Sequence, residues 1–189
     1  FVHDSIYDGF VARLKAAYAS VGVGNPLESE VLVGPLIDRA AYEAMQSALA
    51  AARAAGGVVS GGDRVGDGDS YYVTPALVEM PGQVGPVLEE TFAPILYIMP
   101  YDTLEEAIAI QNGVPQGLSS AIFSLNMRET EAFLAASIAE RNLAFMLGSA
   151  PLRAATIISL ASLVKIRPLA LAASILCLVF HWAPIMHSC

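Results

Sequence analysis

The sequence predicts an α/β fold in which helices cover a mainly parallel sheet. Segments with apolar residues at helical spacing alternate with short apolar runs that resemble strands, and clusters of Gly, Asn and Pro separate them. Strands that follow one another through helices and short connections run parallel, because a parallel pair needs a crossover. This pattern covers residues 1–136, whereas residues 137–189 are a different kind of sequence.

Two amphipathic helices are expected in the first third of the chain. Between Asp8 and Ser20 one face of a helix collects the residues Phe10, Val11, Leu14, Ala17 and Tyr18. Asp38 can cap a second helix, which should end at Gly56-Gly57. Its apolar stripe consists of Ala41, Met45, Ala48, Leu49 and Ala52.

The middle of the chain should supply the strands and two shorter helices. Strands are expected at 58–60, 71–80, 95–99 and 117–124, with Gly117 making the turn before the last of them. Pro75 interrupts the second of these strands, which predicts a sheet edge or a bulge. Thr103 and Glu106 have capping-box spacing for a helix that ends at Asn112-Gly113, and Asn126 can cap another that runs through Phe133 and Leu134.

Charge and cysteine content exclude several functional classes. Up to Glu140 the chain has six Lys or Arg and 18 Asp or Glu, a net charge of −12, while the rest has four basic residues and no acid. Such an acidic body does not bind nucleic acid, which needs clustered basic residues. Both cysteines, Cys177 and Cys189, lie in the tail, so the body has no thiol nucleophile and no disulfide. The first ten residues do not resemble a signal peptide, and we expect a reducing, cytoplasmic location.

No metal site is expected. The turn "GGDRVGDGDS" has three Asp residues, but Thr74 stands where a Ca²⁺ loop needs a Glu, so we interpret the segment as a solvated turn. No helix follows it either, which excludes a dinucleotide fingerprint. The three histidines, His3, His181 and His187, have no mutual metal spacing, and Cys177 with His181 has no further ligand.

The stretch "VLEETFAPILYIMPY" has an unusual feature, because two carboxylates, Glu89 and Glu90, lead into an apolar run that should be a buried strand. This stretch and five other segments occur in the order seen in the C-terminal half of the NAD-dependent aldehyde dehydrogenases. The other segments are "FVHDSIYDGFVARL", "VGNPLE", "GPLIDRAAYE", "YYVTPALV" and "QGLSSAIFS". The segments "ETFAPILY" and "QGLSSAIF" look most like the antiquitin branch, the aminoadipate-semialdehyde dehydrogenases. The resemblance implies that residues 1–136 are part of the catalytic domain.

The resemblance also implies a role for two residues. Glu90 falls on the second carboxylate of the family motif E-E-x-F-x-P, which accepts hydrogen bonds from the ribose next to the nicotinamide of NAD, and Phe92 packs beside that ring. Glu89 is expected to point elsewhere and to be exposed. The family's catalytic cysteine, its base and its dinucleotide-binding half match no residue here, so we expect no catalytic residue in this chain.

The tail stops resembling the family between Ala136 and Arg141. A shifted reading frame or a retained intron would explain the sudden loss of acids. A membrane anchor is a second explanation, although the apolar run Leu169–Phe180 is shorter than the ~20 residues that span a bilayer. A buried helical hairpin is the third.

Two functions therefore stay open. The first is a fragment of an NAD-dependent aldehyde dehydrogenase, which oxidises an aldehyde or semialdehyde to a carboxylate, and which is inactive as this isolated chain. In the intact family member the partner is a small-molecule aldehyde and the enzyme is a homo-oligomer. The alternative is a non-enzymatic protein, anchored by its tail or paired with full-length subunits, that reuses the fold.

Overall fold

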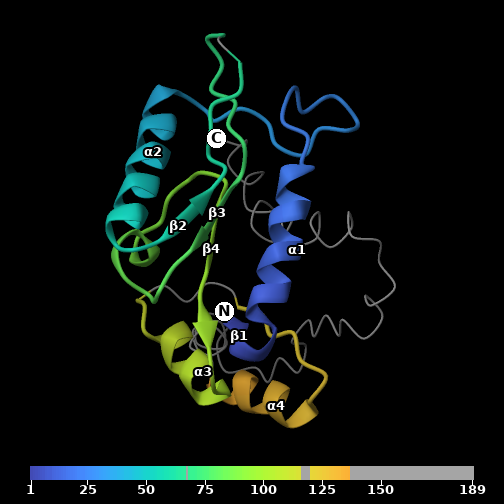
Figure 1. The fold of residues 1–189 in the computed structure, drawn as a ribbon, viewed down its shortest axis with the longest axis vertical. Helices are drawn as coiled ribbons and strands as arrows, with labels where there is room; N and C mark the ends of the chain where they lie inside the picture. The colour runs from blue at the N-terminus through green and yellow to red at the C-terminus, as the bar shows by residue number, and fades with distance from the viewer. Residues whose placement is uncertain (67, 116–119, 137–189) are drawn as a thin grey trace, which may run out of the picture. The chain divides into compact units, whose positions relative to one another are not determined.

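The computed structural model describes residues 1–66, 68–115 and 120–136 (Figure 1). The described part divides into two compact units, Phe1–Pro100 and residues from 101 onward. The predicted tail, residues 137–189, and the predicted turn residue Gly117 lie outside the described residues. The first unit contains the sheet and the two long helices that were expected.

Three strands form the sheet of the first unit, in the order β2, β3, β4. The central strand β3 (Ala76–Glu79) pairs antiparallel with β2 (Val58–Ser60) and parallel with β4 (Ile95–Ile98). The parallel register joins Ala76 to Ile95 and Glu79 to Ile98. The predicted α/β class is confirmed, and the described sheet is mixed because β2 reaches β3 through a turn rather than through a helix.

Helix α1 (Tyr7–Ala19) covers one face of this sheet. It follows the short strand β1 (Val2–His3) and the 3-10 turn η1 (Asp4–Ile6), and Val2 N–H donates to the carbonyl of Met99. Its predicted apolar face is buried against the sheet and one loop residue, in a cluster made of Val11, Leu14, Tyr18, Val33, Leu77 and Ile98. Alternation along β3 explains why Leu77 faces α1 while its neighbours face the other side.

Helix α2 (Arg39–Ala54) covers the opposite face. Asp38 caps it as predicted, with its carboxylate accepting from Ala41 N–H at 2.8 Å, and the chain turns at Gly56, which has φ +87°. Of the predicted stripe, Met45, Leu49 and Ala52 are buried. They form a second core with residues of β3 and its flanks, namely Val73, Ala76, Val78, Met80 and Met99.

The second unit begins in strand β5 (Pro100–Tyr101) and contains helices α3 (Leu104–Asn112) and α4 (Met127–Ala136). The Thr103 hydroxyl accepts from Glu106 N–H at 3.2 Å, and the Glu106 carboxylate accepts from Asp102 N–H at 2.8 Å. Asn126 caps α4 by accepting from Arg128 N–H at 3.0 Å. Both predicted helix starts are confirmed.

Two strand predictions differ from the structure. The described part of the predicted strand 117–124, residues 120–124, has no strand structure, and Phe123 is 57% exposed. A strand needs a neighbouring ladder, and apolar composition alone does not supply one. Pro75 marks neither an edge nor a bulge: it comes directly before β3, which is the central strand. A proline is tolerated there because its missing N–H lies outside the ladder.

Candidate functional site

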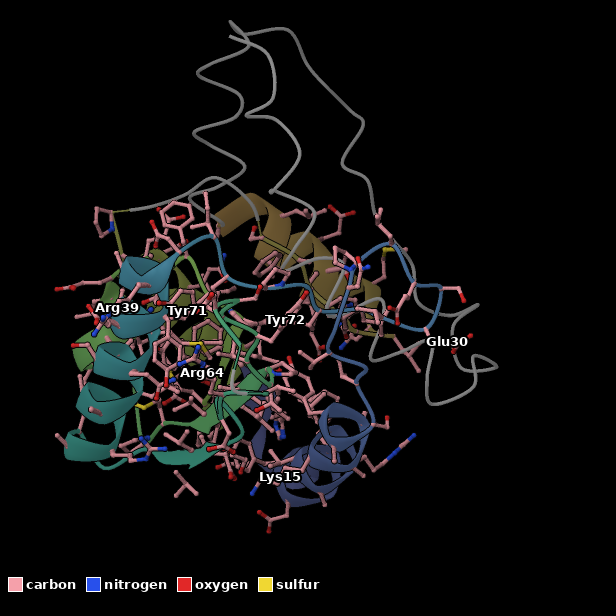
Figure 2. The ribbon with its side chains drawn as sticks, turned by 90° about the horizontal axis from the view of Figure 1, so that it is seen from above. Lys15, Glu30, Arg39, Arg64, Tyr71 and Tyr72 are labelled. Atoms are coloured by element: carbon pink, nitrogen blue, oxygen red, sulfur yellow. The ribbon has the colours of Figure 1, made fainter. Side chains whose placement is uncertain are left out.

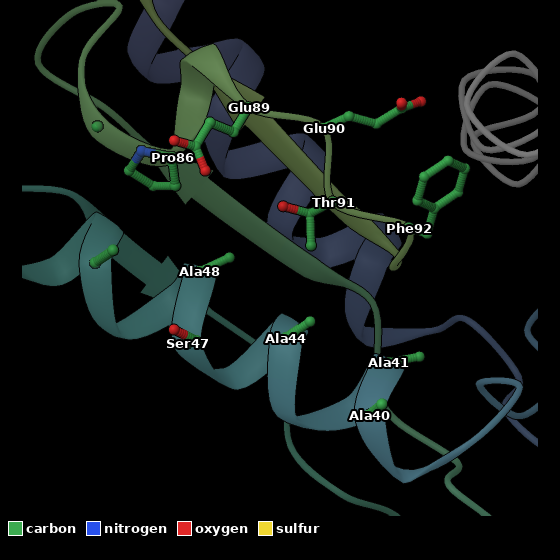
Figure 3. A pocket seen from close by; sticks show the side chains of 12 residues that line it. Ala40, Ala41, Ala44, Ser47, Ala48, Pro86, Glu89, Glu90, Thr91 and Phe92 are labelled. Carbon is green, nitrogen blue, oxygen red and sulfur yellow. The ribbon is translucent and has the colours of Figure 1, made fainter.

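An open groove lies between α2 and the segment that leads from β3 to β4 (Figure 3). Its volume is about 740 Å³. Every lining residue belongs to the first unit, and together they are Ala40, Ala41, Ala44, Ser47, Ala48, Ala51, Gly85, Pro86, Glu89, Glu90, Thr91 and Phe92. The two residues that the sequence analysis singled out, Glu90 and Phe92, thus lie on the same groove.

Small side chains on α2 form one wall of the groove. Successive turns of the helix place Ala40, Ala44, Ala48 and Ala51 on one stripe, while the large residues Met45 and Leu49 point into the core. Alanine is the strongest helix former and projects only a methyl group, so α2 keeps its helical stability and leaves this side open. The side chains of this wall are therefore short and mainly apolar.

The other wall begins with the 3-10 turn η2 (Gly85–Leu88). Gly85 has φ +60°, a backbone conformation that glycine adopts without strain, and the proline after it suits the start of a helical turn. Glu89 ends η2, with its N–H donating to the Pro86 carbonyl at 3.3 Å. The wall thus turns tightly at both of its ends.

Tight turns also fix the stretch that carries Glu90 and Phe92. Ala93 N–H donates to the Thr91 carbonyl at 2.8 Å, and Ala76 N–H of the central strand donates to the Pro94 carbonyl at 2.8 Å. The second bond ties the segment to the rigid sheet immediately after Phe92. Strand β4 starts at Ile95, as predicted, so five residues separate Glu89 and four separate Glu90 from the start of the strand.

The side chains of this wall point in different directions. Figure 3 shows Glu90 and Phe92 projecting to the same side, whereas Glu89 projects the other way, toward Pro86. Both carboxylates are exposed, and the Phe92 side chain is 82% exposed, which is unusual for a phenylalanine. The expected exposure of Glu89 is confirmed. Glu89 nevertheless lines the groove as well.

The charge of the groove is negative. Its lining residues include two glutamates and no Lys, Arg or His. The groove therefore favours hydroxyl groups or a cation over an anion such as a phosphate.

These residues fit one part of a nicotinamide cofactor. A carboxylate is an acceptor with several lone pairs and can take two hydrogen bonds from a ribose diol, and an exposed aromatic ring can lie against a nicotinamide. The lining offers no cationic side chain to the pyrophosphate. The groove thus suits the nicotinamide riboside end of NAD.

The other candidates from the sequence do not form sites in the described part of the chain. His3 Nδ1 accepts from Ser5 N–H at 3.1 Å and caps η1. Within residues 1–66, 68–115 and 120–136, no group of three or more His, Cys, Asp or Glu side chains is arranged to hold a metal ion. His181, His187 and Cys177 lie outside these residues. In the same part of the chain, no helix has the length and apolar character needed to cross a membrane.

Comparison with known families assigns this α/β segment to a class of oxidoreductase. The model of the aldehyde dehydrogenase family matches residues 1–139. Aldehyde dehydrogenase family 7 member A1 of Pisum sativum is 44% identical over 124 residues, which are 66% of this chain and 24% of the pea protein. Alpha-aminoadipic semialdehyde dehydrogenase of Bos taurus is 44% identical over 128 residues, 67% of this chain and 24% of that protein.

Solved structures agree with this assignment. Lactaldehyde dehydrogenase from Escherichia coli has a TM-score of 0.68 and 37% identity, covering 72% of this chain and 29% of the other. PnpE in complex with nicotinamide adenine dinucleotide has a TM-score of 0.68 and 30% identity, with coverage of 71% and 28%. The chain belongs to the aldehyde dehydrogenase family, within the antiquitin branch, and spans about a quarter of the length of these curated relatives.

The sequence alone does not predict the α2 wall of the groove. The predicted apolar stripe includes Ala41 and Ala48, but both line the groove with four further small residues of α2. The signal was present as alanines four residues apart on one side of a helix whose large apolar residues lie on another side. Alanine suits both a core and an open surface, which is why its spacing alone was ambiguous.

Proposed function

We propose that residues 1–136 are the portion of an NAD-dependent aldehyde dehydrogenase that holds the nicotinamide riboside end of the cofactor. The observation that carries this proposal is that Glu90 and Phe92 project to one side of a groove whose lining has no cation and whose opposite wall is built from alanines. Relatives named as aminoadipic semialdehyde dehydrogenases support a semialdehyde as the substrate class.

Each residue has a distinct task in this proposal. The Glu90 carboxylate accepts hydrogen bonds from the ribose hydroxyls and so fixes the rotation of the riboside. The Phe92 ring packs against the nicotinamide and excludes water from one of its faces. When bound, NAD supplies the hydride acceptor. Orientation matters because hydride transfer requires the two reacting atoms to be held in close, aligned contact.

The reaction also needs a thiolate nucleophile and a base, and the part of the chain that matches the family contains no cysteine. We therefore propose that this chain does not oxidise aldehydes alone and that the nucleophile comes from a segment that corresponds to an earlier part of the relatives. We also propose that residues 137–189 do not belong to the family and arise from a shifted reading frame or a retained intron.

A chimera tests the proposal directly. Residues 1–136 replace the matching quarter of the pea relative, and the chimera is assayed with NAD and aminoadipic semialdehyde beside the unmodified pea enzyme and the isolated chain. The proposal expects activity in the chimera and none in the isolated chain. A folded chimera that binds no NAD, or an isolated chain that turns over aldehyde with NAD, would overturn it.

A further inference from the structure

The second carboxylate of the groove, Glu89, has no role in the proposed function, yet it lines the same groove as Glu90. It points toward Pro86, away from the side on which Glu90 and Phe92 project (Figure 3). The two negative charges therefore flank the groove from different directions. A ligand in the groove experiences both, whichever of them it touches.

The surroundings leave these charges unbalanced. No basic residue lines the groove, and among the described residues neither Glu89 nor Glu90 forms an ion pair. Both side chains are exposed. The wider field has the same sign, since the chain up to Glu140 carries a net charge of −12. A groove of this kind attracts positive charge.

The nicotinamide ring changes its charge during the reaction of the proposed function. The oxidised ring carries one positive charge and the reduced ring is neutral, while the ribose is the same in both. We propose, on the basis of the proposed function, that Glu89 acts with Glu90 and Phe92 as a charge selector that makes this groove bind the oxidised nicotinamide riboside more tightly than the reduced one. The exposed Phe92 ring adds to the preference, because a cation is attracted to an aromatic face.

The size of the preference follows from Coulomb's law. For unit charges about 8 Å apart in water, the attraction corresponds to roughly a twofold change in affinity for each carboxylate. Because both carboxylates are exposed, the effective dielectric constant stays closer to that of water than to that of the interior, and a value of about 50 raises this to about fourfold. The preference should vanish at high salt, because the screening length falls from about 30 Å at 0.01 M salt to about 3 Å at 1 M.

Selection of this kind has a functional consequence. A site that prefers the cationic ring binds the substrate form of the cofactor and weakens its hold on the product form once the charge has been lost. The hydrogen bonds of Glu90 to the ribose do not distinguish the two forms of the cofactor, because the ribose is the same in both. Glu89 contributes the charge without the ribose contact, so it acts as a specificity-determining residue.

The test uses the full chain and two small probes, nicotinamide riboside and its reduced form, at about 0.01 M salt. Saturable NMR shifts of the amides of Ala48 and Phe92 report binding at the groove. We expect the oxidised riboside to bind several-fold more tightly than the reduced one. Glu89→Gln should weaken the oxidised riboside about two- to fourfold and leave the reduced one unchanged, whereas Glu90→Gln should weaken both.

Glu30→Gln is the matched control, because Glu30 is exposed and is not a lining residue of the groove (Figure 2). It should change neither affinity. Equal affinities of the two ribosides, or an equal loss of both in Glu89→Gln, would overturn the charge selector and leave the proposed function intact. A preference that survives about 1 M salt would also overturn it. No saturable shift with either riboside would overturn the proposed function, and the selector with it.

Discussion

Arg64 lies over the ring of Tyr71, with its guanidinium carbon 5.0 Å from the ring centroid. The same guanidinium is 5.7 Å from the ring of Tyr42, and the two rings stack on one another with centroids 5.7 Å apart. Tyr42 belongs to α2, and the other two residues belong to the turn between β2 and β3, where Figure 2 shows Arg64 and Tyr71 from above. The cluster therefore joins this turn to the helix that forms one wall of the groove.

Replacing Arg64 with alanine should lower the free energy of unfolding by about 0.5 to 1 kcal/mol, the usual value of an exposed cation–π contact. The hydrogen bond from Arg64 Nη2 to the Gly68 carbonyl, 2.7 Å long, is lost as well. Urea unfolding monitored by circular dichroism measures the change. Arg13→Ala removes an exposed arginine of α1 and should have a smaller effect; equal losses would mean that the Tyr contacts contribute nothing.

The glycines of the same turn provide a second prediction. Gly62 has φ +83°, and a Cβ atom there would overlap the side chain of Leu49 in the core. Gly66 has φ +77°, but a Cβ atom there would meet no atom within 4 Å. Gly66→Ala should therefore cost only the left-handed backbone conformation, about 1 to 2 kcal/mol.

Gly62→Ala should cost the same backbone term and, in addition, about 1 to 3 kcal/mol for overpacking the core. The difference between the two variants isolates the contact with Leu49. Thermal and urea unfolding of both variants measure it. Equal destabilisation would show that the core around Leu49 yields to the additional methyl group without cost.

The helices could be predicted more fully than the strands. Local signals determine the helix starts, since Asp38, Thr103 and Asn126 each cap the helix that follows them. Strands depend on neighbours that lie far apart in the sequence. The apolar residues before Asn126 carry strand propensity, but residues 120–124 have no strand structure.

The candidate site also has one part that the sequence predicts and one part that it does not. The motif around Glu90 predicts that Glu90 and Phe92 contact the cofactor, which stays a prediction, and both residues line one groove. The opposite wall depends on how α2 is rotated against the sheet, which is decided by the burial of Met45 and Leu49. Alanine spacing does not specify that rotation without the packed core.

Tyr18 gives a prediction for alkaline pH. Burial raises the pKa of Tyr18 to about 12, whereas an exposed tyrosine titrates near 10. Between about pH 10 and pH 12 the unfolded chain has lost this proton while the folded chain keeps it, so the folded state loses stability as the pH rises. Below pH 10 the contribution is fully present.

Tyr18→Phe keeps the ring in the core and removes the titrating group. The free energy of unfolding of this variant should therefore fall less steeply than that of the wild type between pH 10 and pH 12. A shallower decline is expected rather than none, because burial also raises the pKa of Tyr7, Tyr97 and Tyr101. Identical slopes in urea titrations would contradict the role of Tyr18.

The final prediction concerns the two carboxylates in the chimera with the pea relative. Glu90→Gln keeps the size of the side chain and one acceptor oxygen but removes the charge, so the ribose hydroxyls lose a charge-assisted hydrogen bond of roughly 1.5 to 3 kcal/mol. The affinity for NAD and the rate of hydride transfer, both measured by single-turnover kinetics, should fall by a combined factor of about one to two decades. The rate falls as well as the affinity because the bond also orients the nicotinamide.

Glu89→Gln removes the same charge from the neighbouring residue, which projects the other way along the groove. It makes no ribose contact in our proposal, so it should lower NAD affinity only about two- to fourfold, through the loss of long-range attraction, and should leave the hydride step unchanged. The prediction is this asymmetry, because only one of the two carboxylates touches the riboside. A larger loss in Glu89→Gln than in Glu90→Gln would mean that the roles of the two carboxylates are exchanged.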